Sequence, residues 1–323
     1  MRVLITGGCG FVGRHFIEKL QSIASEILVV DSLIEGGGGL ESEKWYFQPR
    51  SNVQIVKLDC RDFFRENNGY FDLAIHLAAV VGGRLTIERN PLAVADDLAI
   101  DANFWKWAIA NKPGHVISFS SSAAYPVILQ NEANRSLREE DIDFENSIGI
   151  PDLTYGWAKL TNEYIGQLAA RMYGLNVSSY RPFSGYGPDQ SLSYPFPSIC
   201  LRAIQNIGSE TFEVWGSGLQ QRDFIHIDDI VDAVLTTYPK ITDGSAINLS
   251  SGKGTSFMEL ASLACNQLGY DPIVRGQTNM PEGVFSRIGD NTYLQKLGWK
   301  PSIGLKEGIA ECIQYLQATS TLN

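Results

Sequence analysis

Short apolar runs alternate with longer stretches of helical periodicity through the first half of the chain. The apolar runs are nearly continuous, which is typical of strands buried on both faces, and they are predicted at Val3–Thr6, Ile27–Val30, Val53–Leu58, Leu73–His76, Val116–Ser120 and Val177–Arg181. Helices between them are predicted at Phe11–Ala24, Leu92–Ala110 and Leu153–Tyr173. This alternation, joined by right-handed crossovers, predicts an α/β fold with a doubly wound parallel Rossmann sheet.

After about Tyr186 the pattern becomes less regular, because prolines at positions 188, 195 and 197 interrupt it. A short helix is predicted near Ile199–Ile207, and Thr211–Trp215 is predicted to be one arm of a hairpin that ends in Gly216–Gly218. Two further helices are predicted at Ser256–Leu268 and Leu305–Leu316. We therefore expect a Rossmann domain over residues 1–185 and a smaller mixed α/β region over residues 186–323, with some exchange of chain between them.

Composition excludes several classes of protein. The 323 residues are 44% hydrophobic and 19% charged, as in an ordinary globular protein, and the net charge of −10 argues against a nucleic-acid partner. The five cysteines are scattered without a CxxC pair, which favours reduced thiols over a disulfide framework or a metal site. The chain opens on a predicted strand, and no apolar run reaches the length of a membrane helix. We expect a cytoplasmic protein without a membrane partner.

A glycine-rich turn joins the first predicted strand to the first predicted helix. Gly7, Gly10 and Gly13 allow a tight turn, close approach of a pyrophosphate and close packing of helix on strand, while Phe11 and Val12 open the helix whose N–H groups face the ligand. A glycine-rich turn without a ligand is the alternative. The position between strand and helix favours a dinucleotide site.

Asp31 lies 18 residues after Gly13, at the end of the second predicted strand. An acidic residue there takes the adenosine ribose hydroxyls, and its charge would repel a 2′-phosphate. The sequence therefore favours NAD over NADP as the cofactor.

Tyr155 and Lys159 lie four residues apart, on one face of a predicted helix. Hydride transfer at a carbinol needs a base for the hydroxyl proton, and a free tyrosine has a pKa near 10. A nearby ammonium and a cationic nicotinamide both stabilise the phenolate, which lowers that pKa toward working pH. An ordinary amphipathic pair is the alternative reading.

A serine-rich segment, Ser120–Pro126, ends the strand that precedes this helix. Hydroxyls at the carboxyl edge of a parallel strand face the crevice where ligands bind. One of the three serines could therefore bond the reacting oxygen beside Tyr155, and at least one is expected only to cap the strand.

Together these motifs make the chain resemble the extended short-chain dehydrogenase/reductase family, in its nucleotide-sugar epimerase/dehydratase branch. The resemblance covers nearly the whole chain, and its segments are TGGCGFVG at the start, LDCRD at 58–62, HLAA at 76–79, SSSAAYP at 120–126, YGWAK at 155–159, RPFSGYGP at 181–188, RDFIHIDDI at 222–230 and LGWKPSIGLKEGI near the end. The resemblance implies that residues 1–185 bind NAD, that residues 186–323 bind a nucleotide sugar, and that the protein is a homodimer.

The resemblance also assigns residues. It implies that Tyr155, Lys159 and Ser121 are catalytic, with Ser122 in reserve. Cofactor contacts beyond the glycine turn and the catalytic pair are implied at Asp31, Asp59, Cys60, Leu77, Ala78, Ala79 and Phe183. Substrate contacts are implied at Ser184, Arg222, Arg84 and Arg287, although a surface salt bridge is the alternative for Arg222.

Departures from the family pattern bear on the reaction. Members that eliminate water or carbon dioxide carry acidic residues just after the catalytic hydroxyl, and 3,5-epimerase-like members carry a cysteine two residues after it. Ser122 and Ala123 stand there, and no second acid/base is evident near Tyr194–Phe196. Asp97 lies in a region usually richer in Asn, and Ser184 replaces a frequent Asn.

The remaining set of Ser, Tyr, Lys and NAD predicts an NDP-hexose 4-epimerase that works through a transient 4-keto intermediate. An NAD-linked dehydrogenase/reductase or a 3,5-epimerase acting on a GDP- or CDP-sugar is the enzymatic alternative. The segments Gly82–Arg84 and Pro281–Gly283 resemble GDP-sugar members. A non-catalytic NAD-sensing protein is the alternative outside the enzymes.

Overall fold

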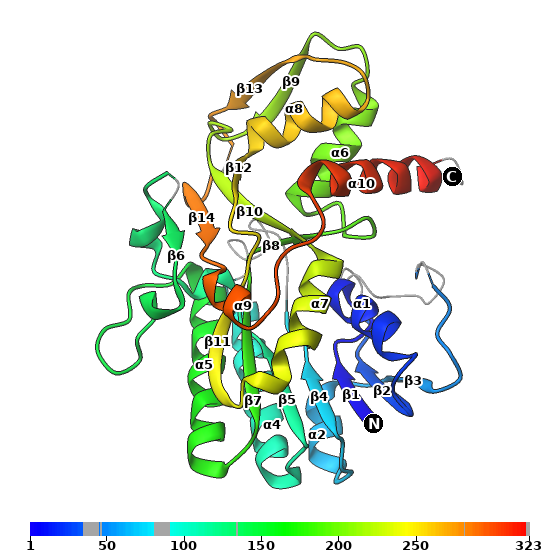
Figure 1. Cartoon of the computed structure of the whole chain (residues 1–323), viewed down its shortest axis with the longest axis vertical. Helices are drawn as coiled ribbons and strands as arrows, with labels where there is room; N and C mark the ends of the chain where they lie inside the picture. The colour runs from blue at the N-terminus through cyan, green and yellow to red at the C-terminus, as the bar shows by residue number, and fades with distance from the viewer. Residues whose placement is uncertain (35–44, 46, 81–90, 134, 281, 321–323) are drawn as a thin grey trace.

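The computed structural model describes residues 1–323 apart from 35–44, 46, 81–90, 134, 281 and 321–323 (Figure 1). A seven-stranded parallel sheet forms the lower half of the molecule in that view. Its strands are β1 (Arg2–Thr6), β2 (Glu26–Asp31), β3 (Val53–Lys57), β4 (Leu73–His76), β5 (His115–Phe119), β7 (Val177–Pro182) and β11 (Asp243–Leu249). The predicted fold class, a doubly wound Rossmann sheet with a smaller mixed region, is confirmed.

The strand order β11-β7-β5-β4-β1-β2-β3 places β1 between β4 and β2, and the direction of winding reverses at β1 and β4. Ligands of such sheets bind outside the carboxyl ends of the strands at this switch point. The turn after β1 and the segment after β4 therefore lie at the expected binding crevice. Strand β11 comes from the second half of the chain and extends the sheet beyond β7, in register with Val177–Pro182.

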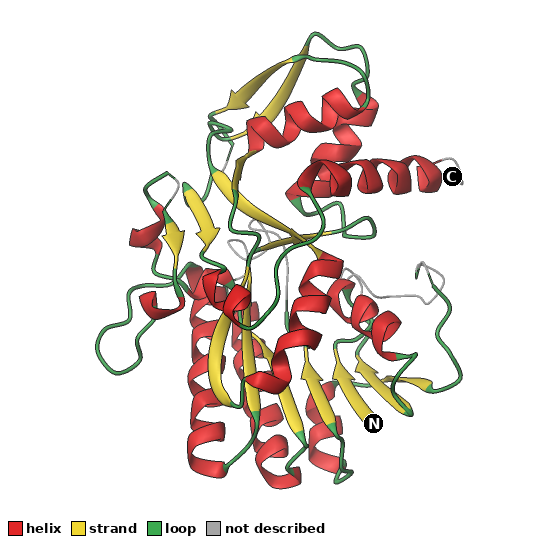
Figure 2. Ribbon diagram, viewed as in Figure 1, coloured by secondary structure: helices red, strands yellow, loops and turns green. Residues whose placement is uncertain are grey.

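Helices cover both faces of this sheet (Figure 2). On one face α1 and α7 pack in a core with Phe16, Ile17 and Val231, and on the other α2, α4 and α5 pack around Phe104 and Trp105. Their bounds are α1 (Phe11–Leu20), α2 (Cys60–Glu66), α4 (Ala93–Asn111), α5 (Leu153–Tyr173) and α7 (Ile227–Thr237). No helix among the described residues has the length and apolar character to cross a bilayer.

The second region lies above the sheet in Figure 1 and contains two smaller sheets. One follows the order β12-β10-β14-β6 with β8 beside β10, and the other pairs β13 with β9. Their bounds are β6 (Ser136–Leu137), β8 (Ser184–Tyr186), β9 (Thr211–Trp215), β10 (Gln221–His226), β12 (Gly254–Ser256), β13 (Ile273–Gln277) and β14 (Ser286–Gly289). The helices of this region are α6 (Pro195–Gln205), α8 (Phe257–Gln267), α9 (Thr292–Lys296) and α10 (Leu305–Ser320).

One sequence prediction about this region is wrong, and the bounds of another are shifted. Thr211–Trp215 is no hairpin arm, because β9 pairs in parallel with β13, with Thr211 opposite Ile273. The helix predicted near Ile199 begins at Pro195, since proline at a first helical position loses no hydrogen bond. The division of the chain at residue 185 stays a prediction.

Candidate active site

The turn after β1 requires backbone without side chains. Gly7 has φ +68°, and a Cβ there would lie 2.7 Å from the Cα of Ala78. A Cβ on Gly13 would lie 2.5 Å from the backbone of Gly8. Gly10 precedes the first turn of α1, which Phe11 and Val12 open. This bare backbone at a helix N-terminus is a cradle that fits a pyrophosphate.

Asp31 lies beside this turn. Its carboxylate accepts hydrogen bonds from the N–H groups of Cys9 and Leu33, both at 2.9 Å. These two bonds hold the carboxylate beside the glycine turn, where we predict that the adenosine ribose binds. Arg14, which directly follows Gly13, is bound by Asp189, with 2.8 Å between Nη2 and Oδ2.

Most of the other predicted cofactor residues follow the carboxyl ends of β3 and β4. Asp59 caps α2 by accepting from Arg61 N–H at 2.8 Å, and it also pairs with the Arg61 guanidinium at 2.6 Å. Cys60 is buried, and burial raises the pKa of its thiol to about 12, so that it stays protonated. Leu77, Ala78 and Ala79 follow β4, where Ala78 contacts the glycine turn.

Helix α5 brings Tyr155 and Lys159 against the serine-rich segment after β5. A Cβ on Gly156 would lie 2.3 Å from the carbonyl oxygen of Ala123, so the helix start approaches as closely as a glycine allows. The Lys159 Nζ lies 5.7 Å from the centre of the Tyr155 ring. Ser121 accepts from Ala123 N–H at 3.1 Å and takes part in a side-chain hydrogen bond with Tyr155. The structure therefore brings Ser121, Tyr155 and Lys159 together.

The charges of this group are coupled. Burial raises the pKa of the Tyr155 phenol, and the Lys159 charge and the Ser121 hydrogen bond only partly offset this rise, so the pKa stays above its ordinary value in this structure. Burial lowers the pKa of Lys159, but Tyr155, Asp101 and Asp97 outweigh burial and leave that pKa raised. Lys159 is thus an ammonium next to a phenol, the arrangement that a tyrosine base needs.

The three serines have different environments. Ser120 donates to Glu163, whose carboxylate is bound by Arg181 at 2.7 Å in a buried ion pair. This pair anchors the strand end, so Ser120 is the serine with a structural role. Ser122 is buried and opens a short 3₁₀ helix, η2 (Ser122–Ala124). Ser121 is the one bonded to Tyr155, and Ser122 stays the reserve prediction.

The predicted substrate residues come from β8, β10 and β14. Ser184 opens β8, directly after Phe183. Arg222 and Arg287 are neighbours in register across β10 and β14. Arg222 donates to the carbonyl of Val284 at 3.0 Å, and Arg287 lies 2.6 Å from Asp152, the residue that precedes α5. Arg84 lies outside the described residues, as do Gly82 and Gly83 of the same segment.

Three residues near the catalytic pair were not singled out as site residues by sequence reasoning. Asp97 and Asp101 on α4 are buried and act on Lys159 electrostatically. Burial raises the pKa of Tyr194 to about 12, and the Tyr155 phenol contributes to that shift. In the sequence, the Asp at position 97, in a region where the family usually has Asn, was a signal of an unusual site. The sequence around Tyr194 gave no such signal.

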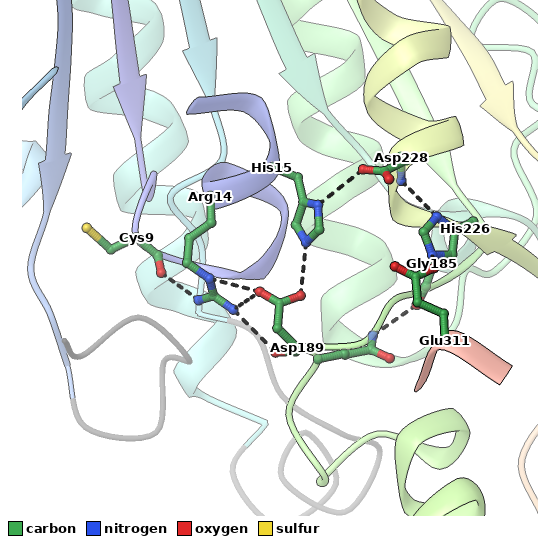
Figure 3. Close-up of polar contacts among 9 residues, drawn as sticks. Cys9, Arg14, His15, Gly185, Asp189, His226, Asp228 and Glu311 are labelled. Atoms are coloured by element: carbon green, nitrogen blue, oxygen red, sulfur yellow. Dashed lines mark hydrogen bonds and ion pairs between the residues drawn. The ribbon is translucent and has the colours of Figure 1, made fainter. Parts of the chain in front are cut away.

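A buried ionic cluster connects α1 to the second region behind the glycine turn (Figure 3). Arg14 donates to the Cys9 carbonyl at 2.9 Å and pairs with Asp189. His15 contacts Asp189 at 2.9 Å through Nε2 and Asp228 at 3.4 Å through Nδ1. Burial lowers the pKa of His15, but the two carboxylates outweigh burial and leave that pKa raised. The cluster fixes the cofactor turn relative to the start of the second region.

A Rossmann sheet with a bare glycine turn after its first strand, a fixed carboxylate beside that turn and a Ser, Tyr and Lys group is typical of nicotinamide-dependent enzymes of the short-chain dehydrogenase/reductase type. Residues 3–250 match the NAD dependent epimerase/dehydratase family, and the chain belongs to this family. The resemblance inferred from the motifs is confirmed. Proteins similar to this chain are nucleotide-sugar enzymes, and NAD is the family's cofactor.

The similar proteins carry different reaction names. A dTDP-4-dehydro-6-deoxy-D-allose reductase from a Streptomyces species is 28% identical over 308 residues, 89% of this chain and 87% of the relative. A putative UDP-glucose 4-epimerase from Methanocaldococcus jannaschii is 27% identical over 320 residues, 98% of each chain. The dTDP-glucose 4,6-dehydratase of Streptomyces venezuelae, solved with NAD bound, aligns with a TM-score of 0.83 at 21% identity over 100% of this chain and 98% of that one.

Proposed function

We propose that this enzyme inverts C4 of a nucleotide hexose by transient oxidation to a 4-keto sugar. The observation that carries the proposal is the identity of the two residues after Ser121. Ser122 and Ala123 are buried, and neither can transfer a proton in the way that elimination or ring-carbon epimerisation requires. The remaining group suffices for moving a proton on and off one hydroxyl.

Each residue of the group has a defined task in this proposal. Tyr155 accepts the C4 hydroxyl proton and later returns it, and Lys159 stabilises the phenolate that accepts it. Ser121 hydrogen-bonds the reacting oxygen. Bound NAD supplies the acceptor and donor of hydride. The glycine cradle at Gly7 and Gly13 fits the cofactor's pyrophosphate because any side chain there would collide with backbone.

Mass spectrometry of product formed in D₂O tests the reaction type. A 4-epimerase returns the hydride to C4, so the carbon skeleton should gain no deuterium over many turnovers and the NAD should show no net change of redox state. A gain of one mass unit at a ring carbon would refute the proposal. A panel of UDP-, GDP-, CDP- and dTDP-sugars, read by NMR, identifies the substrate, and net consumption of NAD would indicate the dehydrogenase/reductase alternative.

Ser184, Arg222 and Arg287 are our proposed contacts to the nucleotide sugar. Arg222 and Arg287 are aligned across two paired strands, an arrangement that suits a diphosphate between them. Alanine at either position should raise KM for the nucleotide sugar more than it lowers kcat.

We also propose a homodimer. The support is an apolar stripe along α5, where Leu153, Trp157 and Tyr164 are 39%, 46% and 42% exposed on one helical face. Figure 1 shows this helix at the edge of the molecule. Light scattering should give twice the chain mass, and Trp157→Glu should give the single-chain mass.

A 3,5-epimerase is the second candidate, because Tyr194 provides another phenol beside Tyr155. A second acid/base on the opposite side of the sugar is what that reaction needs. The raised pKa of Tyr194, about 12, weighs against its acting as a base. Deuterium at C3 or C5, abolished by Tyr194→Phe, would decide for this candidate.

A further inference from the structure

Two carboxylates of α4 lie buried behind the catalytic lysine. Asp97 and Asp101 are four residues apart and therefore share one face of the helix, where they are 1% and 3% exposed. Both act on the charge of Lys159, which α5 presents to this face. Burying two carboxylates costs free energy unless each is compensated, so their presence calls for an explanation.

Each carboxylate satisfies only one of its oxygens within the described part of the chain. Asp97 accepts a hydrogen bond from Val80 N–H through Oδ1, and Asp101 contacts His76 Nε2 at 3.1 Å through Oδ1. The Oδ2 atoms of both are buried and have no hydrogen-bond partner among the residues that the structure describes. Most buried polar atoms in proteins have a partner, so two exceptions beside one catalytic lysine indicate an electrostatic role.

His76 does not neutralise this pair. Its Nδ1 lies 2.7 Å from the Thr6 hydroxyl, and its ring stacks on Phe104 with 4.0 Å between centres. Burial lowers the pKa of His76, so that the imidazole is uncharged near neutral pH. The two carboxylates therefore depend on the ammonium of Lys159 for their compensation.

We propose that Asp97 is a positioning residue that acts on Tyr155 and Lys159 through its charge: it keeps Lys159 protonated and sets the pH at which Tyr155 becomes a base. The inference rests on the proposed function, in which Tyr155 is the base. The carboxylate favours the ammonium and disfavours the phenolate, so it adjusts both members of the catalytic pair at once.

The ionisation of Asp97 falls in the working range of an enzyme. Burial raises the pKa of Asp97 to about 6, with Lys159 and the Val80 amide opposing the rise. The negative charge is therefore present above about pH 6 and absent below it. Among the described residues, the groups that act electrostatically on Asp97 are Lys159 and Tyr155 from α5 and Asp96 and Asp101 from its own helix. His76 of β4 contacts Asp101, and Arg61 of α2 pairs with Asp96.

Asp97→Asn tests the proposal, because it keeps an oxygen for the Val80 amide and removes only the charge. The Tyr155 phenol should then ionise about one pH unit lower, since a like charge has been removed from its surroundings. Ultraviolet difference titration measures this shift directly in the purified enzyme, with the same variants in a Tyr155→Phe background as the blank. The acid limb of the pH profile of kcat/KM should move to lower pH by the same amount.

Asp96→Asn is the matched control, because it removes a neighbouring charge from the solvent-facing side of the same helix. It should leave the Tyr155 titration and the acid limb in place. Asp101→Asn serves as a second variant and should shift the titration in the same direction as Asp97→Asn. An unmoved Tyr155 titration in both buried variants, with a rate lowered equally at every pH, would mean a structural role and would overturn the proposal. The titration does not require turnover. A failure of the proposed reaction can therefore be told apart from a failure of the proposed role of Asp97.

Discussion

Gly156 sets the distance between Tyr155 and the Ser121 segment, the two halves of the proposed catalytic group, and Gly156→Ala should increase that distance. This glycine lies between Tyr155 and the body of α5, and it packs on the segment that carries Ser121. The added Cβ would lie 2.3 Å from the Ala123 carbonyl oxygen and 2.9 Å from the Pro151 Cβ.

The geometry gives the size of the effect. Carbon and oxygen atoms in close contact normally lie about 3.3–3.6 Å apart, so relief of the clash separates the helix start from the strand end by about 1 Å. A displacement of that size in a catalytic group costs about 100-fold in rate. The overpacking itself should cost about 1–3 kcal/mol of unfolding free energy. NAD affinity should change little, because the glycine cradle lies on a different element.

The assay compares kcat, NAD affinity by calorimetry and Tm for the wild type and the variant. Gly304→Ala is the control, because no heavy atom lies within 4 Å of its added Cβ, and it should leave kcat unchanged. A Gly156→Ala enzyme whose kcat stays within about threefold of the wild type would refute the reasoning, since the contact would then not determine the position of Tyr155 relative to Ser121.

Three further predictions concern the cofactor, the base and the ionic cluster. Tyr155→Phe should lower kcat by two or more orders of magnitude while NAD stays bound, because positioned proton transfer contributes about 10²–10⁴-fold; near-normal turnover would remove Tyr155 from its role. Calorimetry should give at least tenfold tighter binding of NAD than of NADP because of Asp31, and equal affinities would contradict this. The pKa of His15 is raised on folding, so its contribution to stability is complete below about pH 6.5 and declines as pH rises through the raised value. His15→Gln should therefore lower Tm more at pH 6 than at pH 8, and an equal loss at both would contradict a charged His15.

Much of the fold was predictable because strands buried on both faces produce continuous apolar runs. The six predicted strands of the Rossmann sheet are all present. Strand β11 was missed, since its segment begins with polar and glycine residues after an irregular stretch. The hairpin at Thr211–Trp215 was wrong because an alternating pattern identifies a strand but not its partner, which follows about 60 residues later at Ile273–Gln277.

The candidate site, like the fold, could be predicted from the sequence only in part. Tyr155 and Lys159 could be predicted to lie together because residues four apart on a helix share one face. The environment of Asp97 and the pairing of Asp189 with Arg14 could not be predicted, because each depends on packing between distant segments. Arg14 and Asp189 are 175 residues apart in the sequence. The family resemblance had already pointed to Ser121, and the structure adds that Ser120 bonds Glu163 while Ser121 bonds Tyr155.

The ionic cluster behind the cofactor turn has a consequence for dividing the protein. A fragment ending near residue 185 would lack Asp189, the acceptor for Arg14 and His15, and would also lack β11 from its sheet. Two buried cations would lose their counter-charge, and the edge of β7 would be uncovered. We therefore expect that residues 1–185 do not fold as an autonomous unit. A chimaera that joins residues 1–185 of this chain to the second region of a relative would therefore need an acid that pairs with Arg14 and His15 and a strand that pairs with β7.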